Sequence, residues 1–225
     1  MGIQQSLDFN WHFHLGDISG AENPAYNDTT WRSLNVPHDW SVEGEYSEDH
    51  PTGWQGGYLP CGIGWYRREL QWNNAWTDKR VEIQFVGIYM NSDVWVNGTH
   101  LGNRPYGYSS FKYDLTPHLN QNQNIIAVRI DHENARSGRW YTGSGIYRHV
   151  WLNVSDPLYL DPWQTFITTP KISDSHIHLA HFASKAKPTE LLLQPNQSPL
   201  PSQQQTFASH QIKHSAKPTR RTLYI

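Results

Sequence analysis

Residues 93–102, DVWVNGTHLG, contain the clearest structural signal in the sequence. The first four residues form a short, apolar-rich run of the kind that favours a strand. Asn97-Gly98 follows directly, and this dipeptide is the strongest short signal for a β-hairpin turn. Residues 100–102 would then form the return strand. The stretch therefore predicts a β-hairpin.

Short alternating runs bounded by turn-forming residues recur through the first two-thirds of the chain. In residues 80–86, for example, Val81, Ile83 and Phe85 fall on one face of the expected strand. No window of about 12 residues has a helical period with caps at both ends. The pattern predicts an all-β sandwich or barrel of seven or more short strands. Further strands are expected over residues 9–15, 65–70, 124–130 and 148–154.

The composition excludes several classes of partner. The 225 residues carry a formal net charge of −2 and have a pI near 6.7, so the chain is not drawn to nucleic acid or to an anionic membrane. No run approaches the roughly 18 consecutive apolar residues of a membrane span. We see no secretory signal at the start and expect a cytoplasmic protein. The single cysteine, Cys61, excludes an internal disulfide and fits a reducing compartment.

Aromatic residues are abundant, with eleven Trp and twelve Tyr. One interpretation places them in a Trp-rich sandwich core, where each ring buries a large area. The other makes them flat platforms for the apolar C–H faces of sugar rings. The sequence leaves both interpretations open for any single Trp.

The character of the chain changes towards its end. Every Gly lies at or before Gly145 and every Trp at or before Trp163. Residues 194–211 are dominated by Gln, Ser and Pro, a composition that buries too little apolar surface to offset the entropy of ordering. We therefore expect a folded domain over residues 1–155, a linker and strand over 156–178, and a disordered tail over 179–225. The tail is either natural or the out-of-frame product of a frameshift.

Six strings between residues 7 and 154 carry a family resemblance. They are FNWHF (9–13), DTTWR with VPHDW (28–32, 36–40), GWYRR (64–68), FVGIY with VWVNG (85–89, 94–98), YGYSSF (106–111) and, most specific, RWYTGSGIYR (139–148). In this order they resemble the N-terminal sugar-binding domain of family 2 glycoside hydrolases of the β-galactosidase type. The resemblance implies a jelly-roll-like, galactose-binding-domain-like β-sandwich at the front of a multidomain exo-glycosidase. It also implies that residues 162–173 begin an immunoglobulin-like domain, and that a TIM barrel with two catalytic glutamates follows.

No catalytic residue is assigned from the sequence. Retaining glycosidases need two carboxyl groups about 5–5.5 Å apart, and the resemblance places that pair in the barrel. We therefore expect no hydrolysis by this chain alone, and we assign no cofactor. His176 and His178 alternate on a strand but have no third ligand at a useful spacing, so we assign no metal.

The resemblance also implies that one loop of the domain reaches the enzyme's active site, and residues 134–141 are its counterpart. Arg139 can donate a forked pair of hydrogen bonds to sugar hydroxyls, or it can pair with a nearby acid. Trp140 and Tyr141 can stack on a sugar face, although Trp140 can also pack inward. Asp39 either accepts hydrogen bonds from a sugar or caps backbone N–H groups in a turn. These four residues are the candidate substrate-binding residues.

Three functions remain open. The first is the accessory domain of a β-galactosidase-like hydrolase, with carbohydrate as its ligand and the downstream immunoglobulin-like and TIM-barrel domains as its packing partners. The second is a stand-alone carbohydrate-binding module, which needs exposed aromatics around Trp54, Trp140 and Tyr141. The third is a truncated gene product without a function of its own. The resemblance also shows two departures. Well-known bacterial β-galactosidases carry an Asp in this loop and an Asn in the glycine-rich entry, whereas this chain has Arg139 and Cys61 there. The departures indicate a different branch of the family.

Overall fold

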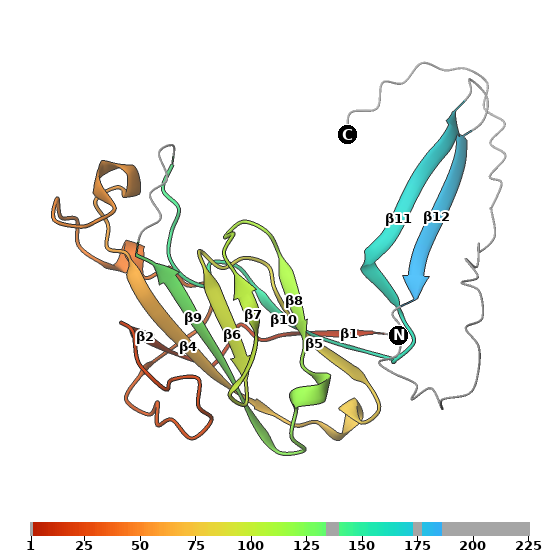
Figure 1. Ribbon diagram of the computed structural model, residues 1–225, viewed down its shortest axis with the longest axis horizontal. Helices are drawn as coiled ribbons and strands as arrows, with labels where there is room; N and C mark the ends of the chain where they lie inside the picture. Colours follow the sequence, from red (N-terminus) through yellow and green to blue (C-terminus); the bar gives the residue numbers. More distant parts are fainter. Residues whose placement is uncertain (1, 134–139, 173–176, 186–225) are drawn as a thin grey trace, which may run out of the picture. The chain divides into compact units, whose positions relative to one another are not determined.

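The computed structural model describes residues 2–133, 140–172 and 177–185 (Figure 1). The chain divides into two units, Met1–Asp156 and Pro157–Ile225. The first unit is a sandwich of two antiparallel sheets, as the alternating sequence pattern predicts. The smaller sheet has the order β1 (Ile3–Ser6), β10 (Val150–Ser155), β5 (Arg80–Phe85), β8 (Phe111–Asp114). The larger has the order β3 (Arg32–Leu34), β2 (Trp11–Leu15), β4 (Gly62–Gln71), β9 (Gln123–His132), β6 (Ser92–Val96), β7 (Thr99–Arg104).

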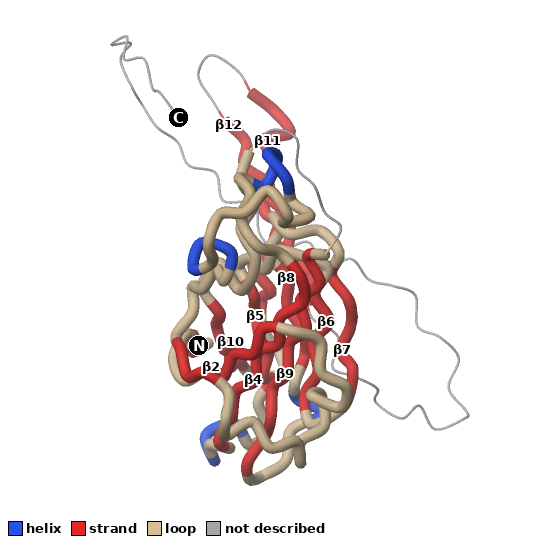
Figure 2. Tube along the Cα trace, turned by 90° about the vertical axis from the view of Figure 1, so that its left-hand side faces the viewer, coloured by secondary structure: helices blue, strands red, loops and turns tan. Residues whose placement is uncertain are grey.

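The only helical segments among the described residues are short 3-10 turns, and they lie in the connections rather than in the sheets (Figure 2). None of the described helices is long and apolar enough to cross a membrane. The turns are η1 (Ser41–Glu43), η2 (Gly53–Gly56), η3 (Asn74–Trp76) and η4 (Thr116–His118).

The hairpin predicted from residues 93–102 is confirmed as β6 and β7. Asn97 and Gly98 have φ angles of 51° and 79°, the left-handed values that a tight hairpin turn requires at both central positions. The Asn97 amide also donates to the carbonyl of His118 and to Asn124 Oδ1, both at 2.8 Å, and its oxygen accepts from the Ile125 backbone N–H. Asn97 therefore fixes the hairpin to β9 as well as forming its turn.

The core lies between the two sheets and follows the predicted alternation. Val81, Ile83 and Phe85 of β5 all face inward and are buried. Phe85 stacks on Phe111 of β8 with ring centroids 5.2 Å apart. These side chains belong to one apolar cluster to which both sheets contribute. The all-β sandwich inferred from the sequence is confirmed.

The outer face of the larger sheet is covered by a second layer, the segment of residues 16–31. Ala21 and Trp31 of this segment pack on Trp65 of β4 and Ala127 of β9, and all four are buried. Because β4 is covered on both faces, four consecutive residues of it are buried, and simple alternation is lost there.

Arg67 anchors this covering segment from within the sheet. Its side chain is only 1% exposed, and its Nε donates to Asp28 Oδ2 at 2.9 Å. Its remaining nitrogens donate to the backbone carbonyls of Ala21, Asn23 and Tyr26. The buried guanidinium therefore donates hydrogen bonds to carbonyl oxygens of a loop whose backbone is not paired in a β-sheet.

The first strand of the larger sheet begins later than expected. β2 starts at Trp11 rather than at residue 9. Asn10 has a φ of 63°, in the left-handed region, so the chain turns there and no ladder can run through it. Phe9, before that turn, points into solvent and is 57% exposed.

In the part of the second unit that the structure describes, β11 (Leu160–Ile172) and β12 (Ile177–Lys185) form an antiparallel pair in which Ile172 pairs with Ile177. The strand expected over residues 162–173 falls largely within β11. The expected boundary at residue 178 lies inside β12, because the backbone ladder continues to Lys185. Residues 186–225 of the expected tail lie outside the described residues.

Candidate functional site

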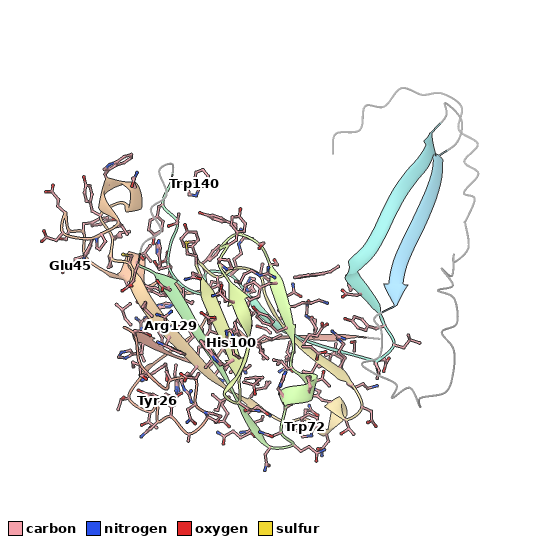
Figure 3. The ribbon with its side chains drawn as sticks, in the orientation of Figure 1. Tyr26, Glu45, Trp72, His100, Arg129 and Trp140 are labelled. Carbon is pink, nitrogen blue, oxygen red and sulfur yellow. The ribbon has the colours of Figure 1, made fainter. Side chains whose placement is uncertain are left out.

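Two connections meet at one end of the sandwich. The first joins β3 to β4 and contains residues 39–61, and the second joins β9 to β10 and is described at Glu133 and from Trp140 onward. Figure 3 shows Glu45 and Trp140 at this end and Trp72 at the opposite one. Backbone hydrogen bonds join the connections: the His38 N–H donates to Ile146 O at 2.8 Å, and the Trp40 N–H donates to Ser144 O at 3.1 Å.

Asp39 binds the two connections together through both carboxylate oxygens. Its Oδ1 accepts from the backbone N–H groups of Ser41 at 3.0 Å and Ser144 at 2.8 Å. Its Oδ2 accepts from the Tyr141 hydroxyl at 2.7 Å. Asp39 thus caps backbone N–H groups and at the same time holds a candidate sugar-binding side chain.

Gly143 is required beside this carboxylate for two reasons. Its φ is 75°, a left-handed value that favours glycine. A Cβ at this position would lie 2.7 Å from Asp39 Oδ2. The glycine-rich string after Tyr141 is therefore explained by the close approach of the Asp39 carboxylate.

The side chains of Trp140 and Tyr141 are exposed, by 57% and 41% respectively. The Trp140 indole N–H donates to the Tyr108 hydroxyl at 2.8 Å, and the Tyr108 ring contacts that of Tyr106. Burial raises the pKa of the Tyr141 phenol, and its hydrogen bond to Asp39 raises it further. We call these four linked residues the aromatic rim: Tyr106, Tyr108, Trp140 and Tyr141.

Three more exposed aromatic residues come from the 39–61 connection. Tyr46 is 76% exposed, Trp54 is 68% exposed and Tyr58 is 38% exposed. Tyr46 lies close enough to Tyr141 to influence its ionisation. Large exposed aromatic side chains gathered at one end are typical of a surface that binds a ligand or another domain.

A buried polar cluster lies beneath the rim. The Ser41 hydroxyl donates to Ser144 Oγ at 2.6 Å, and Ser144 Oγ lies 2.6 Å from His132 Nδ1. A Ser–His contact of this kind can generate a nucleophile, but Ser144 and Ser41 are buried and no substrate can reach them. The cluster instead supports the backbone that positions Tyr141. The sequence analysis missed it, because its members are 12 and 103 residues apart.

A second polar chain starts at His38. Its Nδ1 lies 2.6 Å from the hydroxyl of Tyr66, and its Nε2 lies 3.3 Å from Glu43 Oε2. Glu43 also accepts a forked pair from Arg32, at 2.5 and 2.8 Å. The Arg32 guanidinium holds the pKa of Glu43 down at about 2, whereas burial lowers the pKa of His38. Glu43 is therefore ionised at neutral pH and His38 is neutral.

Three of the four predicted site residues are brought together by the structure, namely Asp39, Trp140 and Tyr141. The fourth, Arg139, lies outside the described residues. Trp140 does not pack inward, since more than half of it is exposed. No group of three or more metal-ligating side chains occurs within the ranges that the structure describes. His178 is part of β12, and His176 is outside the described residues.

Residues 4–156 match the family described as glycosyl hydrolases family 2, sugar binding domain. The chain belongs to this family. It is 48% identical over 174 residues to a β-galactosidase of Bacteroides ovatus, covering 76% of this chain and 20% of that protein. It is 44% identical over 170 residues to a putative β-glucuronidase of Formosa agariphila, covering 76% of this chain and 16% of that protein.

Solved structures show the same fold. A β-glycosidase from Bacteroides vulgatus matches with a TM-score of 0.76 and 45% identity, over 82% of this chain and 24% of that one. A β-glucuronidase from Bacteroides uniformis matches with a TM-score of 0.71 and 27% identity, over 80% of this chain and 22% of that one. The chain thus spans about a fifth of the length of the curated relatives it matches.

Proposed function

We propose that this chain is the N-terminal sugar-binding domain of a β-galactosidase-like hydrolase, which cleaves O-glycosyl bonds in carbohydrate metabolism. In this role the aromatic rim forms one wall of the sugar site. The observation that carries the proposal is the position of Asp39, which holds Tyr141 and the Ser144 backbone beside the exposed Trp140.

The chemistry of the rim suits a polyhydroxylated ring. The indole of Trp140 offers a broad apolar face to sugar C–H groups, and phenol hydroxyls offer polar contacts at its edge. Tyr141 stays protonated at physiological pH because its pKa is raised, so its hydroxyl keeps donating to Asp39 while its oxygen can accept from a sugar hydroxyl. In the proposed parent enzyme an immunoglobulin-like domain follows this domain along the chain, and a TIM barrel comes after it. The barrel carries the catalytic carboxylates and faces the rim.

A rim of this size supplies only part of a site. One or two stacked side chains gain a few kcal/mol, which barely offsets the entropy lost on association. We therefore expect the chain to bind galactose or lactose with a dissociation constant of about a millimolar or weaker. Titration with either sugar, followed by tryptophan fluorescence or amide chemical shifts, measures it.

A chimera tests the role in catalysis. Residues 2–156 of this chain replace the matching domain of the Bacteroides ovatus β-galactosidase, with which the chain is 48% identical. Trp140→Ala in the chimera is expected to lower kcat/KM for a chromogenic β-galactoside by about tenfold, equivalent to about 1.4 kcal/mol of lost transition-state binding. Phe9→Ala is the matched control, because the Phe9 and Trp140 side chains are both 57% exposed. Phe9 precedes the first residue of β2, at the end of that strand that is farther from the rim.

The chimera experiment has two clear outcomes. A loss for Trp140→Ala that is absent for Phe9→Ala supports the rim as a wall of the sugar site. Equal activity of both variants and the parent chimera would show that the rim does not contact the substrate.

A stand-alone carbohydrate-binding module is the second candidate, and the exposure of Trp54 and Trp140 favours it. Such a module holds its ligand without help from another domain. Saturation of the chain at micromolar galactose or lactose would show a complete site and would favour this function over the first.

A further inference from the structure

An open cavity of about 460 Å³ lies beside the 39–61 connection. It is bounded by β2, by residues 30–32 and by part of the connection that includes Trp40, Glu43 and Gly44. No residue of the aromatic rim lines it. Its volume falls within the range of small-ligand sites.

Aromatic rings form much of the cavity lining. The Phe13 and Trp40 rings are stacked with centroids 5.6 Å apart, and the His14 and Trp31 rings lie 5.4 Å apart at an angle of 33°. The exposed side chain of Thr30 stands at the edge with a hydroxyl that accepts and donates. The cavity thus combines apolar faces with a few convergent polar groups.

One buried nitrogen atom in the cavity wall, Trp40 Nε1, lacks a hydrogen-bond partner among the described residues, and the Trp40 side chain is more than nine-tenths buried. Trp40 lines the cavity, and His38 Nε2 faces Glu43, which also lines it. An unsatisfied buried donor in a native protein calls for an explanation, and a ligand with hydroxyl groups supplies acceptors.

The charges in the cavity wall balance. Arg32 and Glu43 form a closed fork, and Glu43 is ionised at neutral pH because its pKa is about 2. The wall therefore presents one positive and one negative group side by side. An anionic ligand would meet the Glu43 carboxylate and a cationic one the Arg32 guanidinium, so a neutral ligand fits best.

We propose that this cavity is a second carbohydrate site, separate from the aromatic rim, which takes one neutral hexopyranose ring such as the terminal ring of a glycan. The apolar part of the lining packs against the C–H groups of the sugar, while Thr30 and the Arg32–Glu43 fork bind its hydroxyls and the Trp40 indole N–H gains an acceptor. The ligand class rests on the proposed sugar-binding function, but the site shares none of its residues with the rim.

Indole N–H resonances of the full 225-residue chain distinguish the two sites. Methyl β-D-galactopyranoside is the neutral probe and sodium D-glucuronate is the anionic one. We expect the neutral probe to shift the Trp40 indole and the Gly44 amide resonances, with glucuronate giving at least about a tenfold weaker response. The Trp140 indole, assigned with Trp140→Phe, reports binding at the rim.

Thr30→Phe is designed to block the cavity, because Thr30 is exposed at its edge and a larger ring there narrows the entrance. Thr99→Phe, on the exposed start of β7, is the matched control. The block is expected to abolish the Trp40 and Gly44 shifts and to leave any Trp140 shift unchanged, whereas the control changes neither. Arg32→Gln, which opens the fork, is expected to weaken the same shifts by at least about threefold.

The outcomes separate this proposal from the proposed function. Shifts at Trp140 alone would overturn the cavity site and leave the rim intact. Shifts at Trp40 that disappear in Thr30→Phe, without a response at Trp140, would support the cavity site and count against the rim. Trp40 shifts that persist in Thr30→Phe, an equal response to glucuronate, or no response at Trp40 would each overturn the cavity site.

Discussion

The covering segment of residues 16–31 and the loops at the rim are each organised by one charged side chain, Arg67 and Asp39 respectively. Arg67 is buried and donates to loop carbonyls, and the large rings packed between the covering segment and the sheet, Trp31 and Trp65, are also buried. Asp39 is only partly buried and accepts from loop N–H groups, and the rings beside it, Trp140 and Tyr141, are exposed. The first arrangement stabilises the sandwich, whereas the second presents side chains to a ligand.

Arg67→Met is expected to have the largest effect, because it removes the anchor of the covering segment. The variant leaves Asp28 Oδ2 and three loop carbonyls without their donor, which costs about 3–5 kcal/mol of unfolding free energy. Urea unfolding measures the loss. Arg129→Met is the control, since Arg129 is 22% exposed and its loss is expected to cost about 1 kcal/mol. Equal losses in the two variants would show that burial of Arg67 has no special role.

Asp39→Ala is expected to cost less, about 1–3 kcal/mol, because it leaves two backbone N–H groups and one hydroxyl without their acceptor near the surface. The effect should be local. Hydrogen exchange at the Ser41 and Ser144 amides is expected to accelerate, while exchange in β9 changes little. Unchanged exchange at these two amides would show that Asp39 does not hold the rim loops.

Much of the sandwich could be predicted from the sequence, because its strands bury one face against the core and alternation reports that burial directly. The hairpin at Asn97-Gly98 and the inward face of β5 are examples. The burial of β4 is harder to predict from its sequence, since the covering segment buries the outer face of this strand as well. That second layer depends on Arg67 reaching loop carbonyls about 40 residues away, and no local pattern records such a contact.

The candidate site could be predicted only in part. The string at residues 139–148 indicated the loop, and VPHDW indicated Asp39, but their mutual contact is a tertiary one over 102 residues. The cap formed by Asp39 on Ser41 is local and was one of the two interpretations open from the sequence. The Ser41–Ser144–His132 cluster and the His38–Glu43 contact have no sequence signature, because common residue types meet there only after folding.

Gly143→Ala tests how closely Asp39 approaches the rim loop, and Gly20→Ala in the covering segment is its counterpart. An alanine there must adopt a φ of 75° and would place its Cβ 2.7 Å from Asp39 Oδ2, so we expect a loss of about 2 kcal/mol. Gly20→Ala has a similar φ of 81° but no atom within 4 Å, so it carries the backbone cost alone, about 1 kcal/mol. Thermal unfolding of both variants, and of Gly143→Ala combined with Asp39→Ala, measures the difference. A loss at position 143 no larger than at position 20 would exclude the predicted crowding.

Low pH is expected to reduce the free energy of unfolding through the covering segment and through the loops near the rim, by less than the Gly143→Ala substitution does. The pKa values of Asp17 in the covering segment and of Glu43 near the rim both lie at about 2, because Arg129 and Arg32 respectively donate to them. A lowered carboxyl pKa stabilises the fold above the unfolded value of about 4, and this stability is lost as the pH falls towards 2. Both carboxylates are partly exposed, so solvent screening keeps each contribution below about 1 kcal/mol.

The same acid series includes a contribution from His38. Burial lowers its pKa, so the unfolded chain binds a proton more readily below pH 6.5, and stability falls in that range too. Unfolding of the wild type, Glu43→Gln and Asp17→Asn from pH 7 to pH 2.5 measures these slopes. Each carboxamide variant is expected to lose part of the slope below about pH 4.5. Slopes identical to the wild type would show that neither ion pair contributes.

Trp140→Ala is expected to have the smallest effect on stability, within about 0.5 kcal/mol, although it removes the largest side chain at the rim. More than half of the ring is already in solvent, and its indole N–H can exchange Tyr108 for water. Trp31→Ala, at 7% exposure in the covering segment, is expected to cost about 3–5 kcal/mol. Urea unfolding of the two variants therefore separates a ring kept for presentation from one kept for packing. A loss of several kcal/mol for Trp140→Ala would show that this ring is needed for packing. Trp140 would then not be a side chain held in solvent to bind sugar.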